Sequence, residues 1–362
     1  MKIDFNSMDE NIRELYEYMW NDNYNNIPGG ANNLCQTYDK RYSKNSKNSY
    51  SFEILNDVGK ILKNKEIVTK ERKQNEKNKK VVCNYLASIF NLKNKEKFEE
   101  KFLEVCSGSG AEAAKITTLH SSSLCALLFF YNTEETKISI SLNGKVVEFD
   151  EVHFEYKNTV TKKGGPSNMD VVLVSNTQHI ILFLESKFSE YLKPESVEVR
   201  YEYINEFEKA FYNENFLNSI NMQILKDKNT GSIKRTRITK KGKKEEYFVL
   251  AAADKRPACY AEGIKQMISH YIGVTNFKDG HFCSREKKRL NQNYSVYLGE
   301  IVFDFNYEKA KKQLENYESH YKVLVDALQL KKPNFEMLKL PLKYSELKDK
   351  CEVQVRKFYY GQ

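Results

Sequence analysis

Apolar residues along the chain recur with two different periods, one typical of helices and one typical of strands. The helical period is interrupted by short apolar or alternating runs, and Asn143-Gly144 between two of these runs is a two-residue hairpin signal. Helices are expected over residues 7–20, 50–87, 111–118, 121–131, 196–213, 260–272 and 307–330. Strands are expected over residues 137–142, 145–149, 153–157, 169–174, 179–187, 247–252 and 295–303. The pattern therefore predicts a mixed α/β protein.

Two of the predicted strands, residues 169–174 and 179–187, are rich in Val, Ile, Leu and Phe, which is typical of strands buried on both faces. If they form a hairpin that turns near residues 177 and 178, Asp170 lies opposite Glu185 and their Cβ atoms are about 5 Å apart. Side chains alternate along a strand, so Lys187 shares a face with Glu185. A slip of one residue would scatter the three groups, and the register is therefore a hypothesis.

This arrangement favours metal-assisted hydrolysis. Two neighbouring carboxylates raise each other's pKa, and a divalent cation relieves their repulsion. Carboxylate oxygens together with a backbone carbonyl, such as that of Ser186, suit Mg²⁺, for which Mn²⁺ can substitute. Lys187 could orient the attacking water and stabilise charge on a phosphorane-like transition state. The sequence thus predicts hydrolysis of a phosphodiester around Asp170, Glu185 and Lys187.

The segment PSNMD at residues 166–170, followed by an apolar strand and ESKFSE at residues 185–190, resembles the PD-(D/E)xK, restriction-endonuclease-like nuclease superfamily. GSGAEAAK and LHSSSLCALLFF upstream resemble the first helical segment of one branch, and residues 263–271 resemble the helix that carries a glutamine. The resemblance implies an αβββαβ core with a central mixed sheet, to which helices are added at both ends. It also implies Mg²⁺, DNA cleavage, metal ligation by Asp170 and Glu185, and a catalytic Lys187. The proline of the motif, Pro166, stands four residues before Asp170 instead of next to it.

The resemblance also implies a further acid from the first core helix or strand. Glu112, after a glycine turn, is the first choice, and Glu155 on the preceding strand is its rival. An exposed acid is the plain alternative for both residues. Gln266 on the downstream helix is expected to hydrogen-bond the site or a phosphate, although a polar residue on a helix edge has the same appearance.

The expected organisation is a helical region over residues 1–97, a nuclease core over residues 98–305 and a helical extension over residues 306–362. A basic insertion at residues 226–244 contains one acid, Asp227, and its alternation is typical of a projecting hairpin. Such an arm could follow a DNA backbone, whereas a solvated loop is the simpler reading. The candidate DNA-binding residues are Lys234, Arg235, Arg237, Lys240 and Lys241.

Composition adds modest constraints. The 362 residues carry a net charge of +9, which permits a polyanionic partner without requiring one. Seven scattered cysteines without a CxxC pair predict free thiols in a reducing compartment. Residues 1–8 do not look like a signal peptide, and the apolar stretches are too short to span a bilayer. A cytoplasmic protein without a membrane segment is expected.

Other chemistries have weaker support. Residues 102–110, FLEVCSGSG, resemble the glycine loop of S-adenosylmethionine-dependent methyltransferases, which requires a strand before the glycines, but no NPPY or DPPY sequence occurs. Cys259, His270, His281 and Cys283 lack the paired spacing of a zinc site. The leading prediction is a Mg²⁺-dependent DNA endonuclease in restriction or anti-phage defence, for which a homodimer would supply two cutting centres. The alternatives are a nucleic-acid-binding protein on an inactive nuclease fold and, more remotely, a methyltransferase.

Overall fold

The computed structural model describes residues 83–84, 86–88, 90–107, 116, 121–160, 166–188, 190–192, 196–201, 210–239, 242–253, 261–286, 288–305 and 308–360. Several predictions lie outside these residues. They are the helices over residues 7–20 and 111–118, nearly all of the helix over residues 50–87, and the candidate residues Glu112, Lys240 and Lys241.

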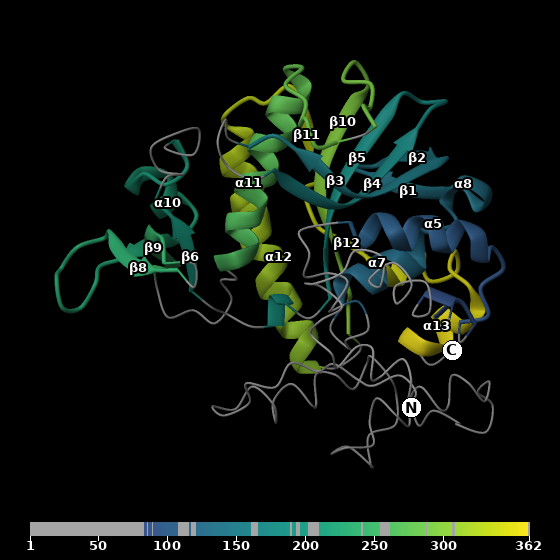
Figure 1. The fold of residues 1–362 in the computed structure, drawn as a ribbon, viewed down its shortest axis with the longest axis horizontal. Coiled ribbons are helices and arrows are strands. Elements are labelled where there is room, and N and C mark those ends of the chain that lie inside the picture. The colour runs from purple at the N-terminus through teal and green to yellow at the C-terminus, as the bar shows by residue number, and fades with distance from the viewer. Residues whose placement is uncertain are drawn as a thin grey trace, which may run out of the picture.

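A mixed six-stranded sheet forms the centre of the protein, as the sequence predicted (Figure 1). Its strand order is β11-β10-β5-β4-β3, and β12 also pairs with β10. The pairs β3–β4 and β4–β5 are antiparallel, whereas β10 runs parallel to β5, β11 and β12. The strands span Glu151–Asn158 (β3), Ser167–Ser175 (β4), Ile180–Lys187 (β5), Ser295–Val302 (β10), Glu336–Met337 (β11) and Leu342–Lys343 (β12).

Helices cover both faces of this sheet, and each face has its own apolar core. On one face α7 (Ser122–Phe130) packs on β4 and β5, and α5 (Lys95–Val105) packs on α7 and β3. On the other face α11 (Ala261–Lys278) contacts β3, β4 and β10, and α12 (Glu308–Gln329) packs against α11. The side chains of β4 and β5 alternate between the two cores, which explains why residues 171–174 and 180–184 are all apolar.

Local signals account for the elements around α7 and the first hairpin. The Ser121 hydroxyl accepts a hydrogen bond from the backbone N–H of Leu124 at 3.0 Å and caps the start of α7. Downstream, β1 (Ile138–Leu142) and β2 (Lys145–Phe149) form the predicted hairpin after the short helix α8 (Thr133–Thr136). Its turn residues have positive φ, 49° at Asn143 and 92° at Gly144, as this turn requires.

A second, four-stranded sheet projects from the body at the left of Figure 1. We call it the arm sheet. Its strand β9 (Lys244–Ala252) pairs with the three others, which are β6 (Val197–Arg200), β7 (Met222–Leu225) and β8 (Arg235–Ile238). The helix α10 (Glu214–Ser219) contacts β7. The prediction of a helix starting at residue 196 was wrong, because the sequence VEVR of β6 alternates buried and exposed side chains and pairs with β9.

The methyltransferase interpretation fails at its first requirement. Residues 102–105, which that interpretation needs as a strand before the glycines, belong to the helix α5. The side chain of Asn94 caps this helix by accepting from the N–H of Lys97 at 2.9 Å, and Phe98, Phe102 and Val105 form its buried stripe.

The segment after β10 contains more than the predicted helices. After α12, it contributes β11 and β12 to the central sheet and then forms the single turn η6 (Tyr344–Leu347) and the helix α13 (Val353–Tyr360). Tyr344 is fully buried and contacts Phe129, Phe130 and Phe303. This segment is therefore part of the main core.

Gly273 allows α11 to lie directly against β3 and β4. A Cβ atom at this position would stand 2.9 Å from Cβ of Asn158 and 3.4 Å from Cβ of Ser167. We expect Gly273→Ala to lower the free energy of unfolding by about 1–3 kcal/mol, because the helix and the strands must move apart. Urea denaturation measures the change. Lys265→Ala on the same helix is the control and should change stability by less than about 0.5 kcal/mol. Equal stability of the two variants would show that this contact is not tight.

Candidate active site

The pairing of β4 with β5 has the predicted register. Val171 pairs with Leu184 and Ser175 with Ile180, and the chain turns at residues 176–179. One step beyond the last pair lie Asp170 and Glu185, side by side at the end of the ladder. The backbone N–H of Ser186 donates a hydrogen bond to Asp170 Oδ2 at 2.8 Å, which holds the Asp170 carboxyl group against the ESK segment.

Glu185 forms an ion pair with Lys187, as expected for residues that share one face of a strand. Lys187 Nζ lies 2.6 Å from Glu185 Oε1, and His270 Nε2 lies 2.8 Å from Glu185 Oε2. The side chains are deeply buried, with residue exposures of 4% for Glu185, 2% for Lys187 and 4% for His270. Burial of this kind is tolerated only because each charged group has partners.

The helix α11 supplies two of these partners. Lys187 Nζ donates to Gln266 Oε1 at 2.7 Å, and His270 is one helical turn further along the same face. The spacing of Gln266 and His270 on the helix thus matches the spacing of Lys187 and Glu185 on the strand. His270 Nδ1 hydrogen-bonds the Ser167 hydroxyl, so the ring is held from both sides. Sequence reasoning considered His270 only as a weak zinc candidate. Its position four residues after Gln266 was the signal for its role beside Glu185.

The two carboxyl groups are in opposite electrostatic situations. Burial and the negative charges of Glu185 and Glu155 raise the pKa of Asp170 well above its usual range. Burial also opposes ionisation of Glu185, but the charges of Lys187 and His270 prevail and lower its pKa to about 2. Glu185 is therefore the ionised member. Asp170 is the member that needs further positive charge before it ionises, and its side chain is partly exposed.

Glu155 lies on the other side of Asp170. Phe154 pairs with Val171 and Tyr156 with Met169, so Glu155 stands beside Asp170 in the β3–β4 ladder. Its backbone φ is 52°, a left-handed conformation that costs of order 1 kcal/mol in a residue with a side chain. Glu155 is 4% exposed and its Oε2 accepts from Asn168 Nδ2 at 3.2 Å. Of the two predicted third acids, it is the one that the structure describes.

Acidic residues continue across the sheet to β10. The parallel pairing of β5 with β10 places Glu300 opposite Glu185, so neighbouring strands carry Glu155, Asp170, Glu185 and Glu300 in one transverse row. Glu300 is 1% exposed, and its Oε2 accepts a hydrogen bond from the Tyr317 hydroxyl of α12. Burial raises the pKa of Glu300 to about 7. Sequence reasoning missed this residue, although a single acid in the apolar strand SVYLGEIV was the signal.

The residues of this row were tested as metal ligands on their own chemistry. No group of three or more His, Cys, Asp or Glu side chains among the described residues has the arrangement of a metal site. Mg²⁺, however, is commonly held by one or two carboxylates together with waters and substrate phosphates. Asp170 and Glu185 provide two neighbouring carboxyl groups. Burial and the charges of Glu185 and Glu155 raise the pKa of Asp170, and a cation beside it would favour its ionised form. The donor set therefore fits Mg²⁺.

The family of the chain follows from comparison with known proteins. A family model described as "Restriction Endonuclease associating with ARP" matches residues 59–272, which is more than half of the chain. The chain belongs to this family. The match confirms the likeness to restriction endonucleases and includes Asp170, Glu185, Lys187, Gln266 and His270. Comparisons with curated proteins and with solved structures found no match. Among the described residues of this family member, no helix has the length and apolar character needed to cross a membrane.

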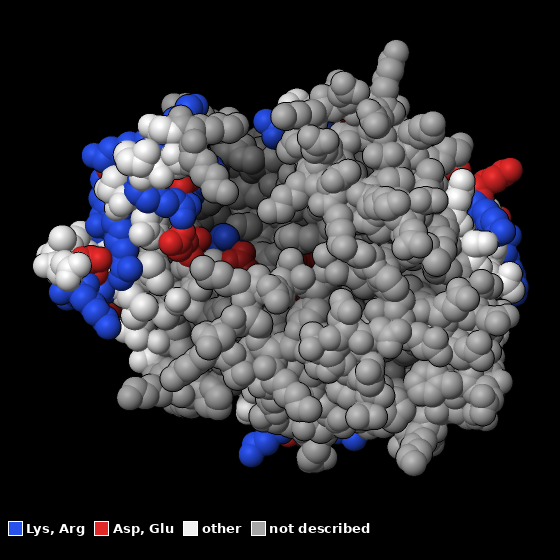
Figure 2. Space-filling view, turned by 60° about the horizontal axis from the view of Figure 1, so that its bottom comes forward, with Lys and Arg blue, Asp and Glu red and all other residues white. Residues whose placement is uncertain are grey.

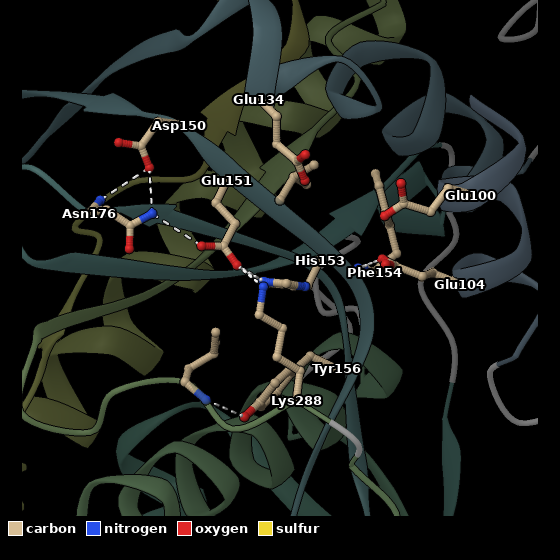
Figure 3. Close-up of polar contacts among 12 residues, drawn as sticks. Glu100, Glu104, Glu134, Asp150, Glu151, His153, Phe154, Tyr156, Asn176 and Lys288 are labelled. Carbon is tan, nitrogen blue, oxygen red and sulfur yellow. Dashed lines mark hydrogen bonds and ion pairs between the residues drawn. The ribbon is translucent and has the colours of Figure 1, made fainter. Parts of the chain in front are cut away.

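In this restriction-endonuclease family member, a cavity of about 690 Å³ runs along the outer edge of β3, and Glu155 lines it. Figure 3 shows the polar groups around it. Glu104 of α5 accepts from the backbone N–H of Phe154 at 3.2 Å, and His153 lies 2.6 Å from Glu151. Glu155, the neighbour of Asp170, therefore faces a cavity and is not enclosed by the apolar core.

The basic insertion forms the outer part of the arm sheet, but folding pairs several of its cations. Lys234 contacts Glu246 at 2.6 Å, Arg237 contacts Glu245 at 2.7 Å and also Glu198. Arg235 lies 3.9 Å from Asp227. Among residues 226–244 the only acid in the sequence is Asp227. In the fold, β6 adds Glu198, and β9 adds Glu245 and Glu246. Three of the five predicted DNA-binding residues are therefore engaged within the protein.

The raised pKa of Glu300 predicts a pH-dependent stability. Glu300 keeps its proton up to about pH 7 in the folded state but only up to about pH 4.3 in the unfolded state. The protonated carboxyl group therefore contributes fully to the free energy of unfolding below about pH 4.3, and this contribution is lost as the pH rises through about 7. Glu300→Gln cannot ionise, so its stability relative to the wild type should rise by up to about 3 kcal/mol between pH 5 and 8. Urea denaturation across this range measures it, with exposed Glu214→Gln as the control. Parallel pH profiles for wild type and Glu300→Gln would contradict the assignment.

The buried ion pair predicts strong coupling between Lys187 and Glu185. Lys187→Met should lower the free energy of unfolding by on the order of 3 kcal/mol, because Glu185 keeps a buried charge that His270 alone must balance. Adding Glu185→Gln should recover much of this loss. A double-mutant cycle in urea, in Mg²⁺-free buffer, gives the coupling energy. Additive effects of the two substitutions would be inconsistent with the described contact.

Proposed function

We propose that this chain is a Mg²⁺-dependent endonuclease that hydrolyses DNA phosphodiester bonds at Asp170, Glu185 and Lys187. The observation that carries the proposal is the half-buried Asp170 beside the Glu185–Lys187 pair, in a chain of a restriction endonuclease family. The element order α7, β3, β4, β5, α11, β10 supports the αβββαβ core that the sequence resemblance implies. We place this core within residues 98–305, with the regions 1–97 and 306–362 as additions.

The proposed metal ligands are Asp170, Glu185 and the backbone carbonyl of Ser186. Glu155 is the better supported third acid, because it neighbours Asp170 and has a strained backbone; Glu112 stays a prediction. Bound Mg²⁺, or Mn²⁺ in its place, would polarise a phosphoryl oxygen and acidify a water molecule. The remaining work falls to residues of the chain itself.

Lys187 is the proposed catalytic ammonium group. Gln266 and Glu185 hold Nζ at a fixed position, where it can orient the attacking oxygen and stabilise negative charge on the phosphoryl group. His270 Nε2 donates to Glu185 Oε2, and the Ser167 hydroxyl contacts Nδ1, so the ring is held from both sides and fixes the direction of the carboxylate. Gln266 and His270 are thus proposed as positioning residues.

A binding protein on an inactive nuclease fold is the second candidate. One observation favours it: both oxygens of Glu185 are already bound by protein side chains, one by Lys187 and the other by His270. Binding of Mg²⁺ separates the two candidates, because an active site must release one of these oxygens to the metal. The family is described as a restriction endonuclease that associates with ARP. By extension, we propose that this chain acts in restriction or defence and that ARP is a partner of it.

Asp170→Asn tests the proposal. The substitution removes a carboxylate that the structure already disfavours in the ionised form, so the variant should fold at least as stably as the wild type. We expect Mg²⁺-dependent cleavage of plasmid DNA to fall by at least about 100-fold, and EDTA to abolish the wild-type activity. Glu214→Gln, an exposed acid, is the control and should cleave normally. Equal cleavage by wild type and Asp170→Asn would refute the proposed site.

A further inference from the structure

The cations of the arm sheet fall into two classes. Lys234, Arg235 and Arg237 have acidic partners, and the rings of Tyr201 and Tyr247 lie under Lys234 and Arg237. Four other lysines are exposed and form no ion pair with any of the described residues. These four, which we call the open lysines, are Lys226, Lys228, Lys243 and Lys244.

The open lysines stand beside two hydrogen-bonded turns. Lys226 and Lys228 flank Asp227, whose Oδ1 accepts from the N–H groups of Asn229 and Thr230, both at 3.0 Å. Gly231 N–H donates to the carbonyl of Asp227 at 2.9 Å and closes this turn. Lys243 and Lys244 follow the β8–β9 turn, where Thr239 N–H donates to the Lys243 carbonyl at 2.8 Å. The backbone beneath each lysine pair is therefore fixed before any partner binds.

The two lysine pairs are separated along β9. Lys244 pairs with Ile238 at one end of that strand, and Leu225, the residue before Lys226, pairs with Val249. At about 3.3 Å per residue, this five-residue step is about 16 Å, of the same order as the ~12 Å width of the DNA major groove. Figure 2 shows Lys and Arg side chains gathered on the lobe that contains the arm sheet. The surface thus presents two preformed cationic points at a separation that suits phosphates on the two sides of one groove.

We propose that the open lysines bind the phosphate backbone of DNA without reading its sequence, while Lys234, Arg235 and Arg237 hold the arm sheet together. This inference rests on the proposed function for its choice of DNA as the polyanion. An exposed lysine without a protein partner gains the full benefit of counterion release on binding a phosphate, whereas a paired cation must first give up its carboxylate. An ammonium group is a compact point charge on a flexible stem and lacks the planar fork of arginine, which suits it to phosphate oxygens. The arm therefore orients DNA for the nuclease centre and leaves base recognition to other residues.

The test measures DNA binding separately from cleavage. The full-length chain carrying Asp170→Asn is titrated with a labelled DNA duplex at several KCl concentrations, and fluorescence anisotropy gives the salt dependence of the affinity. Changing the four open lysines to Gln should reduce the slope of log affinity against log salt by about 3.6, because each lost phosphate contact removes about 0.9. Two duplexes of unrelated sequence should lose affinity equally.

Two controls separate this effect from net charge and from damage to the fold. Lys322, Lys332, Lys339 and Lys350, exposed on the body of the protein, are changed to Gln together and should leave the slope within about 1 of its starting value. Lys234→Gln with Arg237→Gln should lower the unfolding temperature of the protein and leave the slope nearly unchanged. A slope that falls equally for the body lysines overturns the inference.

Other outcomes are equally decisive. If the parent protein does not bind DNA, or if the open-lysine variant keeps its full slope, the inference is overturned. If that variant instead loses binding to vesicles containing phosphatidylserine while DNA binding is intact, the surface belongs to an anionic membrane and the inference is again overturned. Failure of the proposed nuclease looks different: the wild type would show no Mg²⁺-dependent cleavage, while the open lysines would still determine the salt slope.

Discussion

The ion pair between Glu185 and Lys187 is the contact on which the rest of the centre depends. Both side chains are almost fully buried between the two apolar cores of the sheet, so neither could remain charged alone. Each also needs a second partner, and α11 provides both of them, His270 for Glu185 and Gln266 for Lys187. The position and direction of α11 are in turn fixed by its close packing on β3 and β4. The position of α11 on the sheet and the arrangement of the candidate active site therefore both depend on this one buried ion pair.

The acids beside this pair have an excess of negative charge that the described protein balances only in part. The pKa of Glu185 is lowered because Lys187 and His270 face it, whereas Asp170 and Glu300 have raised pKa values because burial and neighbouring acids oppose their ionisation. Such a gradient within one row of side chains is typical of functional sites. Asp170 is the partly exposed member of the pair, and it is where we propose that a metal ion binds.

Segments distant in the sequence complete the centre. The short strands β11 and β12 extend the sheet beyond β10, and the Tyr344 hydroxyl lies 2.8 Å from the Ser186 Oγ, inside the ESK segment. The C-terminal residues therefore support the back of the site. The arm sheet contributes Val199, Phe248 and Leu250 to the core on the α11 face. It also has ion pairs of its own, and it carries the open lysines that we propose as DNA contacts.

The sequence alone determined the parts of this protein that depend on near neighbours. The apolar runs and the turn between them gave the β4–β5 register, and with it the juxtaposition of Asp170, Glu185 and Lys187, because the period of a strand and the length of a turn fix pairing. Only the tertiary structure decided the rest. It brought His270 to Glu185, Glu300 into line with Glu185, Glu155 beside Asp170, and acids of β6 and β9 to the basic arm. These contacts join residues that are far apart in the sequence. The local pattern of residues does not indicate which distant side chain will neutralise a buried charge. The strand β6 shows the same limit, because a four-residue run became a strand through its partner β9.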